Sequence, residues 1–165
     1  LRGGSERMRY WLMKSEPDVF GIGDLRKKKR SGWDGVRNYQ ARNFMRDEMR
    51  KGDLILFYHS NAEPSGIAGI ARVSRESHPD PTQFDRKSEY FDPKATPEKP
   101  IWMMVEVEFV EEFSRLLPLE QLRKEKALSK MPLVQKGTRL SVMPVTESEW
   151  SCIQGLAGAE IKAFR

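Results

Sequence analysis

The chain has 165 residues, a length that predicts one domain with a single hydrophobic core. No run approaches the roughly 20 apolar residues that cross a membrane, so we expect no membrane partner. The net charge of +5 is uneven, because residues 1–51 hold 14 Lys and Arg against 7 Asp and Glu. A basic surface attracts polyanions such as nucleic acid. The densest basic run, RKKKR at residues 26–30, is equally typical of a solvated helix end.

The two ends of the chain predict its domain boundaries. The start is polar and basic and carries no secretory signal. Met8 fits a native start, and residues 1–7 fit an N-terminal extension or an expression remnant. We place one domain at residues 8–158 and a C-terminal tail at residues 159–165.

The few cysteine and histidine residues limit the chemistry. The single cysteine, Cys152, cannot form a disulfide within the chain, which fits a reducing compartment. We expect the cytoplasm for a bacterial protein and the nucleus for a eukaryotic one. Only His59 and His78 accompany Cys152, so a Cys/His zinc site cannot be assembled. We expect neither a metal nor another cofactor.

The first half of the chain predicts three strands and two short helices. In chain order these are a strand at 9–14, a helix at 20–28, a break at Gly32, a helix at 38–49, and strands at 54–59 and 67–74. Phe44, Met45 and Met49 are the inward residues of the second helix. The run LILFYH, residues 54–59, is apolar on both faces, so this strand should be central.

The second half begins with a long irregular segment. In chain order we expect this segment at 79–100, a strand at 101–110, a helix opening at Leu117-Pro118, a strand at 139–145 and a helix at 147–156. Five prolines and the aromatic Tyr90 and Phe91 make the segment an ordered excursion over the surface rather than a linker. Thr146 and Glu149 form a capping box for the last helix, which should end at Gly155 and Gly158.

This order of elements lacks a regular βαβ alternation. It predicts an α+β fold whose mainly antiparallel sheet is curled or closed into a small barrel, with short flanking helices.

The segment WDGVRNYQARN, residues 33–43, carries the strongest functional signal. It holds two aromatic residues among arginines, asparagines, a glutamine and an aspartate, without a strand period and with only a fragment of a helix period. A flat ring beside fixed hydrogen-bonding groups is what a nucleobase pocket needs. A polar loop around one buried Trp explains the same residues equally well.

No motif in the sequence assembles a catalytic group. Phosphate-binding loops, nucleophile elbows and zinc hydrolase or deaminase patterns do not occur. We interpret Cys152 as a small core residue, and His59 as a structural histidine or, alternatively, a donor in a pocket. We therefore expect no enzyme, with a base-modifying enzyme that uses His59 or Cys152 as the weaker alternative.

Several separated strings resemble the EVE domain family. They are YWLMKSEP, WDGVRNYQARN, FYHSN, GIAGIARV, YFDP, WMMVEVEFV, PL-x-x-L and RLSVMPVT, and the resemblance in order and spacing covers residues 10 to about 156. The resemblance implies a PUA-like open β-barrel, related to the YTH domains that read methylated adenine in RNA. It also implies a non-catalytic reader of modified bases, with modified cytosine in DNA favoured and modified single-stranded RNA as the alternative. We expect a monomer.

The matching strings also imply site residues. The nucleobase-binding candidates are Lys14, Ser15, Pro17, Trp33, Asp34, Gly35, Arg37, Asn38, Tyr39, Tyr58, His59, Ser60 and Asn61. Trp33 is the expected stacking ring, and flanking phosphates are assigned to Lys14, Arg37 and Arg42. Some alternatives stay open: Tyr39 and Phe44 as core residues, Arg42 and Asn43 as braces of the loop, and Asp34 as a cap or an ion-pair partner of Arg37.

Overall fold

The computed structural model describes residues 8–163, and side chains as far as residue 158. The predicted extension, residues 1–7, and residues 164–165 of the predicted tail lie outside the described residues. The strands are β1 (Tyr10–Ser15), β2 (Arg30–Gly32), β3 (Leu54–His59), β4 (Gly66–Pro79), β5 (Met103–Pro118) and β6 (Val142–Val145). The α-helices are α1 (Pro17–Phe20), α2 (Ile22–Lys28), α3 (Tyr39–Asn43), α4 (Leu119–Arg123) and α5 (Glu147–Ala163). Short helical turns occupy Phe44–Glu48, Pro81–Phe84, Lys126–Leu128 and Pro132–Val134.

The strands form one sheet in the order β2-β5-β4-β3-β1-β6. β1 and β3 run parallel, while the other neighbouring pairs are antiparallel. β2 and β6 are the outer strands, so the sheet curls without closing. The expected α+β fold with an open, mainly antiparallel and PUA-like sheet is confirmed.

The strand β3 shows why the sheet is buried on both faces. Successive side chains of a strand point to opposite faces. Ile55 and Phe57 therefore join one apolar cluster, and Leu56 and Tyr58 join another on the other face. The central position predicted for residues 54–59 is confirmed, because β3 pairs with both β1 and β4.

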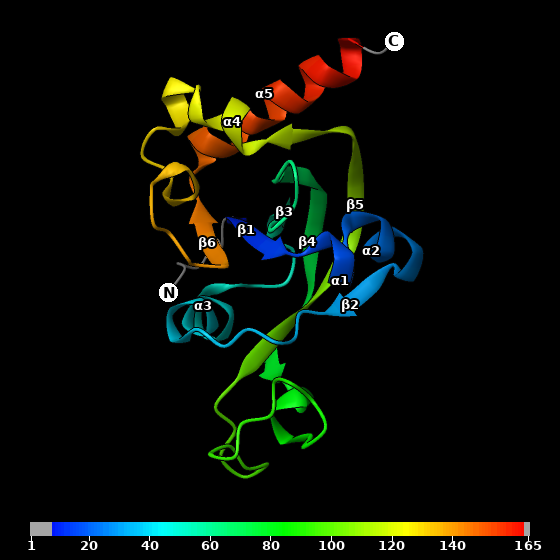
Figure 1. Ribbon diagram of the computed structural model, residues 1–165, viewed down its shortest axis with the longest axis vertical. Coiled ribbons are helices and arrows are strands. Elements are labelled where there is room, and N and C mark those ends of the chain that lie inside the picture. Colours follow the sequence, from blue (N-terminus) through cyan, green and yellow to red (C-terminus); the bar gives the residue numbers. More distant parts are fainter. Residues whose placement is uncertain (1–7, 164–165) are drawn as a thin grey trace.

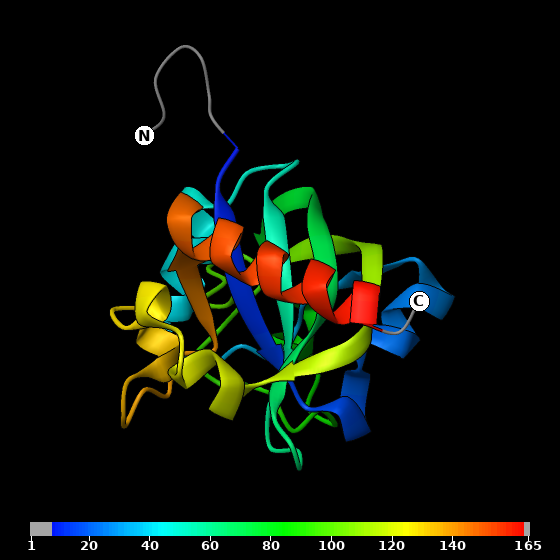
Figure 2. The same ribbon diagram turned by 90° about the horizontal axis from the view of Figure 1, so that it is seen from above.

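Different helices cover the two faces of the sheet. The first cluster takes Ile22 and Leu25 from α2 and Met45 from the turn after α3. The second takes Leu122 from α4 and residues of α5, which runs across the strands (Figure 2). The single core expected from the chain length is thus two apolar layers with a sheet between them.

The predicted helix at residues 20–28 was wrong in detail, and the strand β2 was not predicted. The chain forms two helices, α1 and α2, separated at Gly21, whose N–H donates to the Asp24 carboxylate at 2.7 Å. Gly32, predicted as a break, is the last residue of β2, where it pairs with Glu106. This three-residue strand has no pattern of its own and depends on the edge that β5 offers to it.

The two longest strands exceed their predicted bounds. β4 continues from the expected end at Ser74 to Pro79, and β5 continues from Val110 to Pro118. The helix expected to open at Leu117-Pro118 begins only at Leu119, because Leu117 still pairs with Ile67 of β4. Together β4 and β5 form a long ribbon, and the residues between them project at the end of the molecule opposite α5 (Figure 1).

The last helix begins as predicted and ends later. The Thr146 N–H donates to the Glu149 carboxylate at 2.9 Å, and the Glu149 N–H donates to the Thr146 hydroxyl at 3.1 Å, which confirms the capping box. Gly155 and Gly158 do not end the helix, which continues to Ala163. A glycine in a helix costs about 1 kcal/mol relative to alanine, so it weakens a helix without stopping it.

Candidate functional site

A cavity of about 870 Å³ lies where β1 and β3 end side by side. Its walls come from the end of β1, the helix α1, the loop after β2 and the loop after β3. The site residues predicted from the sequence that line it are Lys14, Ser15, Trp33, Asp34, Gly35, Arg37, Ser60 and Asn61. Segments far apart in the chain therefore meet at one hollow, because β1 and β3 are parallel neighbours.

Trp33 belongs both to the core and to the cavity wall. Its side chain is only 7% exposed and meets the Phe57 ring edge-on, with 5.3 Å between ring centroids. Its backbone N–H donates to the Val105 carbonyl at 2.8 Å, which fixes the loop against β5. Trp33 nevertheless lines the cavity, so a largely buried residue of the core also borders the hollow.

Cationic side chains surround the cavity. Lys14 is half-buried, and this burial lowers the pKa of its ammonium group. Its nitrogen lies 5.8 Å from the centroid of the Tyr58 ring. Lys28 and Arg139 also line the cavity, although neither was predicted as a site residue. The cavity therefore has positive charge on more than one side.

Asp34 supplies an acidic group among these cations. Burial and the neighbouring Asp80 raise the pKa of Asp34, while Arg37 and Lys28 oppose this effect. The expected alternative of an Asp34–Arg37 ion pair is not what forms, because Arg37 pairs with Asp80 at 3.1 Å. The carboxylate of Asp34 thus lines the cavity without an ion pair among the described residues.

Arg37 uses all of its hydrogen-bonding capacity within the protein. A guanidinium group carries five N–H donors. Those of Arg37 donate to the carbonyls of Val36 and Tyr90, the carboxylate of Asp80 and the hydroxyl of Thr82, with Tyr90 accepting twice. This side chain ties the loop after β2 to the segment after β4.

Three polar residues line the part of the cavity formed by the end of β1 and the loop after β3: Ser15, Ser60 and Asn61. The Ser15 hydroxyl donates to the Phe20 carbonyl at 2.6 Å, and the Ser60 N–H donates to the Ser15 carbonyl at 3.0 Å. The Asn61 side chain donates to the Glu16 carboxylate and sits on backbone with a φ of 49°. Asn61 therefore stands beside the cavity in a fixed orientation.

Other predicted site residues do not line the cavity and have structural partners. Asn38 caps α3, since its side-chain oxygen accepts from the Ala41 N–H at 2.9 Å. Tyr39 is 58% exposed and stacks on Trp102 with 4.8 Å between ring centroids, so it is not the core residue considered as an alternative. Arg42 donates to the Ile101 carbonyl and to Asn43, which fits the alternative of a loop brace.

The remaining predicted site residues also lie outside the cavity wall: Pro17, Tyr58 and His59. Pro17 is the first residue of α1, and Tyr58 is buried in the second apolar cluster. The Nε2 atom of His59 accepts from the Ile22 N–H at 3.1 Å at the start of α2. Burial lowers the pKa of His59, against the opposing effects of Glu112 and Asp24. His59 is thus placed as a satisfied structural histidine.

The sequence interpretation missed several residues of the cavity wall, above all Tyr90. This residue comes from the segment between β4 and β5, which the sequence showed only as an irregular run rich in proline. Two signals were available: the family string YFDP, which begins at Tyr90, and the aromatic pair of Tyr90 and Phe91 in a segment that otherwise has no reason to hold large rings.

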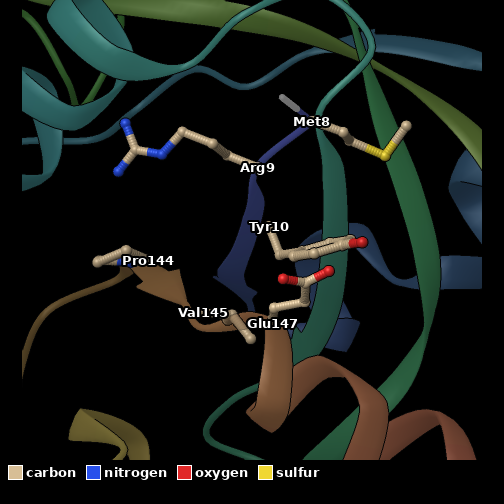
Figure 3. Close-up of a pocket in the computed structure, with 6 residues that line it drawn as sticks. All are labelled: Met8, Arg9, Tyr10, Pro144, Val145 and Glu147. Atoms are coloured by element: carbon tan, nitrogen blue, oxygen red, sulfur yellow. The ribbon is translucent and has the colours of Figure 1, made fainter. Parts of the chain in front are cut away.

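A second hollow, of about 520 Å³, lies at the other end of β1. Met8, Arg9 and Tyr10 line it together with Pro144, Val145 and Glu147, and Figure 3 shows the Arg9 side chain extending away from Glu147. Arg9 already pairs with Glu48 at 3.2 Å. None of the residues predicted for the site lies here.

The described residues contain neither a metal site nor a membrane span. No group of three or more His, Cys, Asp and Glu in residues 8–163 is arranged to hold a metal ion. Within the same part of the chain, no helix has the length and apolar character to cross a membrane.

Comparisons with known proteins agree with this fold. The model of the family described as EVE domain matches residues 9–156. Mouse thymocyte nuclear protein 1 is 41% identical over 96% of this chain and 77% of its own length. A structure of a Leishmania major protein is 50% identical, with a TM-score of 0.90 over 94% of this chain and 98% of that one. The crystal structure of human THYN1 in complex with 5-methylcytosine-containing DNA is 39% identical, with a TM-score of 0.85 over 90% of this chain and 97% of that one. This chain therefore belongs to the EVE domain family.

Proposed function

We propose that this protein is a non-catalytic reader of modified cytosine in DNA, and that the cavity beside Trp33 receives the modified base. One observation carries the proposal: a hollow of about 870 Å³ brings Trp33 together with hydrogen-bonding groups and cations from segments far apart in the chain. The complex of the related human THYN1 with 5-methylcytosine DNA supports the choice of ligand.

A base that leaves the duplex loses stacking and pairing worth a few kcal/mol. Stacking on an aromatic side chain returns about 1–3 kcal/mol per base. In the proposed complex the base lies against Trp33, and the Asp34 carboxylate accepts from the exocyclic amino group of cytosine. Asn61 and Ser60 provide further polar contacts to the base or its sugar.

The phosphates on either side of the base require cations with free donors. Lys14 and Lys28 fit this role, and Arg139 stands beside them at the cavity. Arg37, also predicted as a phosphate contact, has its donors occupied inside the protein, and Arg42 lies outside the cavity. We therefore assign the phosphate contacts to Lys14, Lys28 and Arg139.

A binding panel tests the proposal. Fluorescence anisotropy would measure matched duplex and single-stranded oligonucleotides with cytosine, 5-methylcytosine or 5-hydroxymethylcytosine, in DNA and in RNA, at two salt concentrations. We expect the tightest binding for modified cytosine in DNA. Tighter binding of matched modified RNA would instead favour an RNA reader of the YTH type.

The variant Trp33→Leu tests the pocket itself. We expect it to weaken binding of the methylated oligonucleotide about tenfold, since a stacked base contributes about 1–3 kcal/mol. Trp150→Leu is the matched control, because Trp150 is 8% exposed, much as Trp33 is 7% exposed, and packs in the apolar layer on the other face. Thermal unfolding of both variants would distinguish a folding defect from a binding defect. Equal binding by Trp33→Leu and the wild type would show that the base binds elsewhere.

A further inference from the structure

We propose, resting on the function above, that Tyr90 is a second aromatic wall of the base cavity and that Arg37 is the residue that positions it. Tyr90 lies in the segment between β4 and β5, more than 50 residues from Trp33 in the chain. It nevertheless lines the same cavity as Trp33 and Asp34. The segment is therefore part of the reading site and not only a surface excursion.

The Tyr90 ring rests directly on the loop that carries Trp33. A Cβ atom built on Gly35 would lie 2.8 Å from two atoms of the Tyr90 ring. Gly35 also has a φ of 80°, a conformation that other residues rarely adopt. A glycine at this position thus allows the ring to approach the backbone, and any side chain there would push the ring away.

Arg37 holds Tyr90 from the other side. Its Nε and Nη2 atoms donate to the Tyr90 carbonyl at 3.1 and 2.7 Å, and its guanidinium carbon lies 5.4 Å from the Tyr90 ring centroid. The same guanidinium pairs with Asp80, whose side chain is fully buried, and Asp80 also accepts from the Gly35 N–H at 2.8 Å. Two charge-assisted contacts therefore fix the loop and the segment to each other.

The rest of the segment is held rigidly behind Tyr90. The side chain of Gln83 is buried and bonds the backbone of Asp80, Ile101 and Trp102. The Trp102 indole N–H donates to the Asp92 carboxylate at 2.8 Å. These contacts fix the segment that carries Tyr90, so its ring is preorganised for a flat ligand, which lowers the entropic cost of binding.

An aromatic ring at Tyr90 can pack against the edge or the face of a single heterocyclic base. Every nucleobase has a π-face, so a stacking ring contributes affinity without choosing among bases. In the proposed site, the two rings come from separate segments of the chain and also limit the width of the ligand that the cavity accepts. Tyr90 should therefore affect both the affinity for the modified base and the preference for it over the unmodified base.

The first test compares three variants by anisotropy with a duplex that carries one 5-methylcytosine. Tyr90→Leu should weaken binding about tenfold, whereas Tyr90→Phe, which keeps the ring, should bind within about twofold of the wild type. Phe91→Leu is the matched control, because Phe91 is the neighbouring ring and does not line the cavity. Wild-type affinity for Tyr90→Leu would overturn the proposal, as would an equal loss in Phe91→Leu.

The second test uses a double-variant cycle to identify the positioning role of Arg37. If Arg37 acts through Tyr90, then Arg37→Gln should weaken binding in the wild-type background and add little in the Tyr90→Leu background. If the losses of affinity from Arg37→Gln and Tyr90→Leu multiply in the double variant, Arg37 acts independently of Tyr90, on the fold or on the DNA directly. Unfolding midpoints of all four proteins would be measured in parallel.

The two proposals fail in different ways. If the wild type shows no preference for methylated over unmodified DNA, the proposed function falls and the role of Tyr90 falls with it. If the wild type shows the preference and Trp33→Leu loses it, but Tyr90→Leu keeps it, only the second wall is disproved.

Discussion

Asp80 is the residue on which the loop after β2 and the segment after β4 both depend. Burial by itself would raise the pKa of this carboxyl, but hydrogen bonds from Thr82, Gly35 and Arg37 outweigh it and hold the pKa below its ordinary value. A buried charge of this kind is stable only with its partners in place, because an unpaired one costs several kcal/mol. The ionised carboxylate therefore requires the loop and the segment to be docked.

His59 gives the fold a pH dependence that can be measured. Its Nε2 atom accepts from the Ile22 N–H and so must be unprotonated in the native protein. The native pKa lies below the ordinary value of 6.5, so the unfolded chain binds more protons in the window between the two values. Stability should therefore fall as the pH drops from above 6.5 through the native pKa.

We expect His59→Gln to remove this loss, since a glutamine oxygen accepts the same hydrogen bond without titrating. Urea unfolding of the wild type between pH 7.5 and pH 5 should show a loss of roughly 1 kcal/mol that the variant lacks, the size of one hydrogen bond. His78→Gln, which alters the other histidine, is the control and should retain the wild-type slope. The same slope in His59→Gln would assign the effect to other groups.

Among the elements, those with a local pattern were predictable from the sequence. The strand at residues 54–59 has a continuous apolar run, and the start of α5 has a capping box, so both were placed correctly. β2 and the far ends of β4 and β5 were not, because their pairing depends on a neighbouring strand and not on their own residues. Chain periodicity carries no information about such a partner.

The long pairing of β4 with β5 depends on a close approach at Gly69. A Cβ atom at this position would lie 2.3 Å from the Glu111 carbonyl oxygen of β5. The register of the two strands also shifts on either side of Gly69, from Ile67 to Ala71. Position 69 therefore tolerates no side chain.

Gly69→Ala should destabilise the protein by several kcal/mol, because backbone atoms cannot move as a flexible side chain does. Gly155→Ala is the matched control: Gly155 lies inside α5 with open space around its missing Cβ, so the substitution should stabilise by about 0.5–1 kcal/mol. Urea unfolding of both variants measures the difference. If Gly69→Ala kept wild-type stability, the two strands would have to separate more easily than their contacts imply.

At the scale of the whole molecule, the sequence predicted the fold and brought forward several residues that line the cavity. The cavity gathers residues of WDGVRNYQARN with the residues after β1 and β3, as the family strings implied. The family string YFDP contains Tyr90, but its place at the cavity could not be predicted, because Tyr90 reaches the cavity only through the ribbon of β4 and β5. Asn38 and Arg42 share the signature with Trp33 but bond structural partners, the Ala41 N–H and the Ile101 carbonyl, which sequence proximity alone does not reveal.

The uneven charge of the molecule predicts that its affinity for DNA depends on the salt concentration. Lys28 is the last residue of α2 and belongs to the basic run at residues 26–30, and it lines the cavity. Removing one cation that binds a phosphate should lower the slope of log affinity against log salt by about 1. We expect Lys28→Gln to do so, whereas Lys130→Gln, at an exposed lysine away from the cavity, should keep the wild-type slope. Identical slopes for the two variants would remove Lys28 from the DNA interface.

The place of β1 in the sheet has a consequence for how the protein is made. β1 is the first strand of the chain, yet its neighbours are β3, which follows some 40 residues later, and β6, where Val145 pairs with Tyr10. Contacts between such distant residues slow folding, because a long loop must close before they form. A chain emerging from the ribosome would hold β1 without either partner until β3 appears, and with one edge unpaired until β6 has also emerged. Emergence of β6 is therefore the step at which the sheet can first be completed.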